Sequence, residues 1–343
     1  MNLDQRKLRI LTAVTETYLQ TGLPVGSKCI AEMLDGEVSP ATVRNDMAVL
    51  FEMGLLEQPH TSAGRIPSHI GIRLYIDRLM HAQPLSQQER SEIEALFNRR
   101  NPDPEQLLED SAQALAELTG CAAISTTMYK QNAFVKKIEL IPAATRTVVI
   151  LLIASNGMIK NKVCRVDFNL TPKIVEFFTS FANSRIVGRS INEVTAEYIN
   201  SMAYSLGEYT DLFAPLFSAI YDICREASDG KVYCSGESNL LEYDELRNQA
   251  NHLFRVLSSR EDMISLIEQS PDEIGVSIGK ESKRSELAES SVIISRYKIG
   301  EDSVGAIGLI GPVRMDYAKL IPHIQYFSEM LGKLINDTLR EQE

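Results

Sequence analysis

The sequence predicts a multidomain α+β protein, and three observations support this fold class. The chain has 343 residues, which is long for one domain because domains average roughly 150 residues. Residues 1–83 show helical periodicity followed by one short hairpin pattern, whereas strand-like and helical segments alternate from residue 105 onward. An apolar share of 44% and a charged share of 24% are typical of a globular protein that buries a sizeable core.

The composition excludes several classes of protein. The longest apolar run, Val148 to Ala154, is far shorter than the roughly 20 residues that cross a bilayer, so no membrane span is expected. The polar N-terminal residues precede no apolar segment of signal-peptide type. The five cysteines are scattered and form no Cys-x-x-Cys pair. We therefore expect a cytoplasmic protein.

Three helices are predicted at the start of the chain. The first ends before Gly22, and its apolar stripe consists of Leu8, Leu11, Val14 and Tyr18. The second is short and is expected to run from Ser27, as N-cap, to Leu34. The third has the clearest start, because Ser39 can cap its N-terminus and Pro40 follows at the position where a missing N–H costs nothing.

The third helix is expected to have one buried and one exposed face. The buried stripe consists of Val43, Met47 and Leu50, and the small residues Ala41, Asn45, Ala48 and Val49 lie opposite. Two short extended segments then flank the polar loop 59–64, which indicates a hairpin. This order describes a winged helix-turn-helix, in which the third helix enters the major groove of DNA and the hairpin, or wing, touches the backbone.

The predicted DNA-binding residues fall into two groups. Arg44 and Asn45 have the donors and acceptors that read base edges. The wing side chains suited to phosphate oxygens are His60, Thr61, Ser62 and Arg65. Three further residues complete the predicted DNA-binding surface: Lys28, Ser39 and Thr42. A winged helix that contacts a protein or senses a ligand, and does not read DNA, remains an alternative.

The net charge of −11 does not exclude DNA as a partner. Residues 1–83 hold eight Lys and Arg against nine Asp and Glu, so only about −1 lies there and about −10 lies in the remainder. Exposed charges are screened over about 8 Å at physiological salt, so the local placement of cations decides phosphate contact.

Four sequence blocks closely resemble the HrcA family of bacterial heat-inducible transcription repressors: residues 24–28, 38–47, 54–67 and 308–317. The resemblance implies a GAF-like α+β domain that carries an inserted dimerisation domain. It also implies repression of chaperone operons, relieved on heating, by a homodimer that binds double-stranded DNA at an inverted-repeat operator. This chain would then have two further partners, a second copy of itself and a chaperonin.

The remaining chain alternates between strand and helix. Ser68 to Met80 and a polar connector, about Ser86 to Arg99, are expected to be helical, as is 105–118. Strands are expected at 121–128, 134–141, 147–154 and 159–168, with 147–154 central in its sheet and paired to 159–168 across a turn at Ser155-Asn156-Gly157. Three helical segments follow between 171 and 229, then strands at 274–278, 291–297 and 304–310. A last helix, about Pro322 to Thr338, is expected to pack on its own sheet rather than form an interface.

These elements divide the chain into a winged helix-turn-helix domain (1–83), a linker (84–104), a discontinuous GAF-like domain (105–170 and 240–343) and an inserted, mainly helical dimerisation domain (171–239). The insertion is rich in large apolar residues, Phe177, Phe178, Phe181 and the run 212–217, which we expect at the dimer contact. The alternative is that they pack on the adjoining sheet.

The sequence supports no catalytic site, cofactor site or metal site. Gly305 to Gly311 lacks the G-x-G-x-x-G spacing, Gly279-Lys280 lacks a P-loop, and the histidines and cysteines lack zinc-ligand spacing. We therefore predict a protein that is not an enzyme. Because no reactive Cys pair or nucleotide motif is present to sense stress, we predict that heat acts through the folded fraction, with chaperonin-dependent folding as the link and direct thermal unfolding as the rival mechanism.

Overall fold

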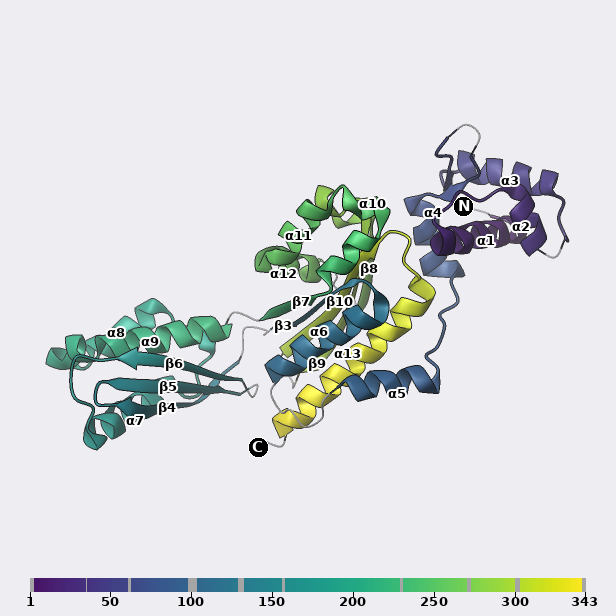
Figure 1. Cartoon of the computed structure of the whole chain (residues 1–343). Coiled ribbons are helices and arrows are strands. Elements are labelled where there is room, and N and C mark those ends of the chain that lie inside the picture. The colour runs from purple at the N-terminus through teal and green to yellow at the C-terminus, as the bar shows by residue number, and fades with distance from the viewer. Residues whose placement is uncertain are drawn as a thin grey trace.

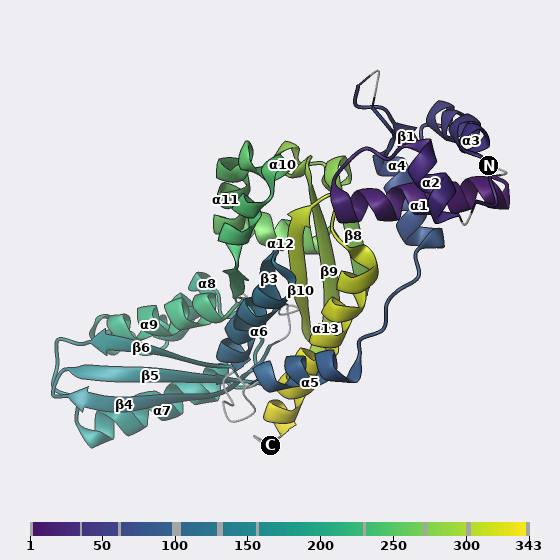
Figure 2. The same ribbon diagram turned by 45° about the vertical axis from the view of Figure 1, so that its right-hand side comes forward.

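The computed structural model describes residues 3–34, 36–60, 63–97, 104–128, 133–155, 158–228, 231–269, 273–299 and 303–340. Three lobes follow one another: an N-terminal domain of helices and a small hairpin, a central domain built on a five-stranded sheet, and an inserted domain with its own three-stranded sheet (Figures 1 and 2). None of the helices in the described ranges combines the length with the apolar character that a membrane span requires.

The N-terminal domain has the predicted order of elements. It contains α1 (Gln5–Thr21), α2 (Ser27–Met33), α3 (Pro40–Glu52), β1 (Leu56–Glu57) and β2 (Ile66–Pro67), and the two strands pair antiparallel. The Ser39 side chain accepts the Thr42 N–H at the start of α3, as expected. The predicted cap at Ser27 is wrong, because Gly26 holds the extended N-cap conformation and Ser27 is already helical.

A fourth helical segment ends the N-terminal domain, and a connector then leads to the central domain. The expected helix 68–80 is α4 (His69–Leu74) continued by a π-helical turn (Tyr75–Leu79), in which the Met80 N–H donates to the Tyr75 carbonyl. The predicted linker 84–104 contains α5 (Gln87–Leu96), which starts at a capping box on Ser86. Phe97 packs on Phe327 with ring centroids 5.6 Å apart, so the end of this connector lies against the central domain.

The central sheet has the order β7-β3-β10-β9-β8 and is antiparallel throughout. Its strands are β3 (Ala122–Met128), β7 (Val232–Ser235), β8 (Ile274–Ile278), β9 (Ser290–Ile299) and β10 (Ser303–Pro312). On one face lie α6 (Pro104–Thr119) and α13 (Tyr317–Arg340), and on the other lie α10 (Asp244–Arg247), α11 (Ala250–Ser258) and α12 (Arg260–Glu268). Short 3-10 turns occupy Ile191–Glu193, Gly207–Tyr209, Glu237–Glu242, Gly279–Ser282 and Ser285–Leu287.

The last helix packs on its own sheet, as predicted, but it begins five residues before Pro322. A proline inside a helix cannot donate to the carbonyl four residues earlier. Here the carbonyl of Ala318 instead accepts the N–H of Gln83, 2.9 Å away. The connector thus supplies the hydrogen-bond donor that the Ala318 carbonyl loses at Pro322, which explains how the helix extends through the proline.

The inserted domain contains strands that the sequence analysis assigned to the central domain. Strands β4 (Val135–Ala144), β5 (Thr147–Ala154) and β6 (Ile159–Arg165) form a separate sheet with β5 in the middle, as expected for that strand. Helices α7 (Pro172–Ile186), α8 (Ala196–Tyr204) and α9 (Thr210–Ser228) share one buried core with this sheet. The insertion therefore begins near residue 133 instead of 171, and β7, expected in the insertion, belongs to the central sheet. Asn156 and Gly157 of the predicted turn Ser155-Asn156-Gly157 lie outside the described residues.

Candidate nucleic-acid interface

Helix α3 presents the two faces that its sequence predicts. Val43, Met47 and Leu50 are buried against the rest of the N-terminal domain. Ala41, Asn45, Ala48 and Val49 are all exposed, and so is Arg44. Small side chains around a cation and an amide allow a helix to approach a surface closely while two polar groups reach it. In Figure 1 this helix lies at the end of the molecule remote from the insertion.

A buried carboxylate fixes α3 against α1. Asp46 is 5% exposed, and its Oδ2 accepts the Arg6 Nε–H at 2.7 Å while Oδ1 lies 3.6 Å from Lys7 Nζ. A guanidinium that donates two bonds to one carboxylate fixes the relative orientation of the two helices as well as their distance. The sequence analysis missed this anchor, because its partners lie 40 residues apart.

Ser39 and Thr42, both predicted DNA contacts, are bonded to each other. Ser39 Oγ accepts the Thr42 N–H at 3.2 Å and lies 2.9 Å from Thr42 Oγ1. These hydroxyls therefore complete the helix cap. Lys28, on α2, is exposed, and so are Arg44 and Asn45. Among the described residues, none of these last three side chains has a hydrogen-bond or ion-pair partner, so their polar groups are available to a ligand.

The base of the wing is held against the segment before α2 and against the C-terminal end of α3. Arg65 exchanges two backbone hydrogen bonds with Val25, and its guanidinium lies over the Phe51 ring, 5.0 Å from the centroid. Arg65 Nε is buried and has no hydrogen-bond partner within the described part of the chain. A Cβ on Gly64 would lie 2.3 Å from the Val25 carbonyl oxygen, so only glycine allows this approach.

The structure thus separates the predicted wing residues. Arg65 lies at the base of the wing beside the C-terminal end of α3, half-buried on an aromatic ring, whereas His60 is exposed near the tip. Thr61 and Ser62 lie outside the described residues. The stacking of Arg65 on Phe51 could not be predicted from local sequence, since the two residues belong to different elements.

A family model matches the central and inserted domains, and full-length relatives match nearly the whole chain. Residues 105–321 match the family model described as "HrcA protein C terminal domain". The heat-inducible transcription repressor HrcA of Clostridium botulinum (strain Eklund 17B / Type B) is 33% identical over 343 residues, covering 98% of this chain and 99% of that protein. The HrcA repressor of Thermoanaerobacter sp. (strain X514) is 34% identical and covers both chains completely.

A solved structure, described as the crystal structure of a hypothetical protein at 2.2 Å resolution, has the same fold. It superposes with a TM-score of 0.70 over 98% of this chain and 100% of that one, at 23% sequence identity.

Proposed function

This chain belongs to the HrcA family of heat-inducible transcription repressors, and from that premise we propose that it represses by binding an inverted-repeat operator as a homodimer, with α3 of each copy in the major groove. The observation that carries the proposal is the exposed face of α3, where Arg44 and Asn45 have free polar groups on a helix anchored by Asp46. Such a protein acts on DNA in the cytoplasm.

The side chains divide by the contacts they would make. Arg44 and Asn45 suit base edges, because a guanidinium pairs with guanine and a carboxamide with adenine through two bonds each. Lys28 and His60 suit phosphate oxygens on either side of the helix, and Arg65 would support the wing and reach the backbone with the terminal nitrogens of its guanidinium. Base contacts decide sequence, while phosphate contacts set position and salt dependence.

Binding to a duplex selected from a random library by the intact protein tests this division. Arg44→Ala and Asn45→Ala should each weaken binding to the selected operator by about 1–3 kcal/mol and leave binding to random duplex nearly unchanged. Arg65→Ala should weaken both and lower the dependence on salt. Arg247→Ala, which removes an exposed guanidinium from α10, is the matched control and should change neither. Equal losses on both DNAs for the α3 variants would contradict base reading by this helix.

The dimer contact is proposed on the open face of the inserted sheet. The large apolar residues expected there are mostly buried: Phe178, Phe213 and Phe217 pack together in the insertion core, whereas Phe177, Leu212 and the small Ala214 are exposed. The packing alternative therefore holds for most of this set. Helices α7, α8 and α9 cover one face of the sheet, and the described part of the chain leaves the other face open.

The open face carries apolar side chains on all three strands, interrupted by the Lys137–Glu139 ion pair and by Asn161. Ile141 pairs with Val149 and Val149 with Val163, so these side chains form one row on the same face. Ile153 pairs with Ile159 and with Lys137 in a second row. Ile141 is 48% exposed and Val163 66% exposed. Exposed apolar side chains grouped on one sheet face beside polar groups are typical of a protein interface, and a second copy of the chain is the partner we propose.

Mass in solution tests this face. Val163→Asp adds a charge to the row without touching the insertion core, so the dimer should dissociate while the monomer stays folded. Val187→Asp, at the end of α7 and 44% exposed, is the matched control and should leave the dimer intact. A dimer that survives Val163→Asp and dissociates in the control places the interface on the helices instead.

We further propose that the central domain is GAF-like and that its folded fraction sets repressor activity, with a chaperonin as folding partner. The five-stranded antiparallel sheet between two helical layers supports the GAF-like assignment. In this sheet β3 pairs with β10 across the whole insertion, and pairing between segments so distant in sequence is slow.

Burial raises the pKa of the Cys121 thiol to about 11 and that of Cys224 to about 12, so neither is a reactive thiolate at neutral pH.

A further inference from the structure

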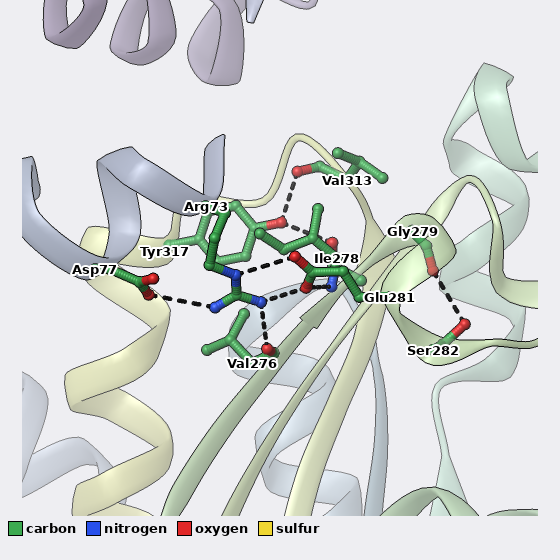
Figure 3. A network of polar contacts seen from close by, with 10 residues as sticks. Arg73, Asp77, Val276, Ile278, Gly279, Glu281, Ser282, Val313 and Tyr317 are labelled. Carbon is green, nitrogen blue, oxygen red and sulfur yellow. Dashed lines mark hydrogen bonds and ion pairs between the residues drawn. The ribbon is translucent and has the colours of Figure 1, made fainter. Parts of the chain in front are cut away.

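One arginine of the N-terminal domain is bonded to three groups across and beside the domain junction (Figure 3). From α4, Arg73 donates through Nε to Glu281 Oε1 at 3.1 Å and through a terminal nitrogen to the Val276 carbonyl at 2.6 Å. The same terminal nitrogen is bonded to Glu281 Oε2, and the other lies 3.4 Å from Asp77 of the π-helical turn. Val276 is in β8, and Glu281 is in the 3-10 turn that follows it.

The carboxylate that receives Arg73 is itself fixed. Glu281 Oε2 also accepts the Ile278 N–H at 2.9 Å, so both carboxylate oxygens have defined partners. Burial alone would raise the pKa of Glu281, but the Arg73 guanidinium and the Ile278 N–H hold it below its ordinary value. Both side chains are partly covered, with 29% of Arg73 and 37% of Glu281 exposed. The pair is therefore ionised at neutral pH and is shielded from water on one side.

A second contact lies one turn earlier on α4. His69 packs on Gly279, where an added Cβ would lie 2.4 Å from His69 Cε1. Gly279 has a φ of 52°, and Lys283, just after the turn, has a φ of 57°, so the backbone is left-handed on both sides of Glu281. Two contacts on one helix, His69 with Gly279 and Arg73 with Glu281, define the direction of α4 relative to the central domain as well as its distance from it.

The block at residues 308–317, which the DNA-binding proposal does not use, builds the surface that receives the N-terminal domain. Tyr317 is completely buried beside the Arg73 pair, and its hydroxyl bonds to Ser291 Oγ and to the Val313 carbonyl, each at 2.7 Å (Figure 3). Arg314 lies against Gly22 at the end of α1 and is paired with Glu245. The junction is therefore supported from both the first and the fourth helix.

We propose that Arg73 is a positioning residue, which fixes the DNA-binding domain on the central domain and thereby sets the distance between half-sites that the dimer accepts. This inference rests on the proposed function. In a dimer held together elsewhere, the separation of the two α3 helices depends on how each N-terminal domain is oriented. A forked guanidinium bound to a carboxylate and a carbonyl specifies that orientation, whereas a lysine would supply charge without direction. An orientation fixed before binding also lowers the entropy cost of engaging both half-sites.

The test measures binding to a series of selected operators in which the spacer between half-sites is lengthened or shortened by one to about five base pairs, roughly half a helical turn. The intact protein should show a sharp optimum. Arg73→Ala should lose about tenfold in affinity at that optimum and bind the altered spacers as well as or better than the intact protein, which flattens the profile. Arg73→Lys should flatten it too, because it keeps the charge and loses the fork.

Arg284→Ala is the matched control, since it removes an ion pair with Asp262 at 2.7 Å inside the central domain and should keep the sharp profile. Binding to a single half-site should be equal in all variants, which separates positioning from loss of fold. An unchanged profile in Arg73→Ala overturns the inference, and so does a gain in affinity at the optimal spacing. An intact protein that recognises half-sites regardless of spacing also overturns it but leaves DNA reading by α3 intact. A protein without preference for the operator over random DNA refutes the proposed function itself.

Discussion

The N-terminal domain and the inserted domain are attached to the central domain in different ways. Three buried residues of the N-terminal domain, Leu19, Ile72 and Tyr75, lie in the same apolar cluster as α13 of the central domain, beside a separate core within residues 10–56. The buried residues of the insertion, from Ala133 to Ala227, form a cluster of their own. Where two regions share a core, opening one exposes apolar surface of the other, so their stabilities are coupled. The difference teaches that the DNA-binding domain shares part of its buried surface with the central fold, while the buried surface of the insertion is separate.

The largest effect should come from removing one aromatic ring from either core. Phe178→Ala in the insertion and Phe327→Ala in α13 each remove a completely buried ring and should cost about 3–5 kcal/mol. Hydrogen exchange followed by mass spectrometry should show faster exchange confined to residues 133–228 in Phe178→Ala. In Phe327→Ala, the central sheet and α1–α4 should exchange faster together. The same pattern in both variants would refute the contrast between a shared and a separate core.

Local sequence accounts for most elements of both regions and for neither attachment. Strands 147–154 and 274–278 have the predicted bounds, and Ser39-Pro40 marks the start of α3, because alternation and caps are written in neighbouring residues. Which sheet a strand joins depends on distant partners, so the border at 171 was wrong. The sequence analysis assigned no element to residues 240–270, so it missed helices α10, α11 and α12.

The candidate site shows the same division. Helical periodicity correctly predicts that Arg44 and Asn45 face outward. The partners of Asp46, Arg65 and Arg73 lie on other elements, and Glu281 is separated from Arg73 by 208 positions. No local pattern marks such pairs, because an ion pair between elements constrains only the residue types at two distant positions.

During refolding, the insertion and the central sheet should become protected at different times. Strands β4, β5 and β6 are consecutive in the chain, whereas β3 needs β10, so the insertion should gain hydrogen-exchange protection before the central sheet does. Added chaperonin with ATP, at constant temperature, should raise the yield of operator-binding protein several-fold and leave the early protection of the insertion unchanged. Full recovery of dilute protein without chaperonin, combined with a sharp loss of binding on heating alone, would favour direct thermal unfolding as the heat response.

The smallest effect concerns the ionic contact that joins the insertion to the central domain. Glu105 of α6 is paired both with Lys160 of β6 and with Lys231, just before β7. Burial would raise the pKa of Glu105, but hydrogen bonds from the two lysines lower it below its ordinary value. A carboxylate whose pKa is lower in the folded than in the unfolded state stabilises the fold above its unfolded pKa, near 4.3, and this contribution is lost as the pH falls through the folded pKa.

Glu105→Gln should therefore reduce the free energy of unfolding by about 1 kcal/mol at neutral pH, a value kept small because the lysines are partly exposed. Urea unfolding should show a constant difference from the intact protein between pH 7.5 and 5.5 that shrinks toward pH 4. Glu226→Gln, which loses a 3.1 Å pair with Lys162 inside the insertion, is the matched control and should cost less. If Glu105→Gln also slowed or sped hydrogen exchange throughout α1–α4, the two attachments would be coupled after all, because the insertion contact would then reach the DNA-binding domain through the central sheet.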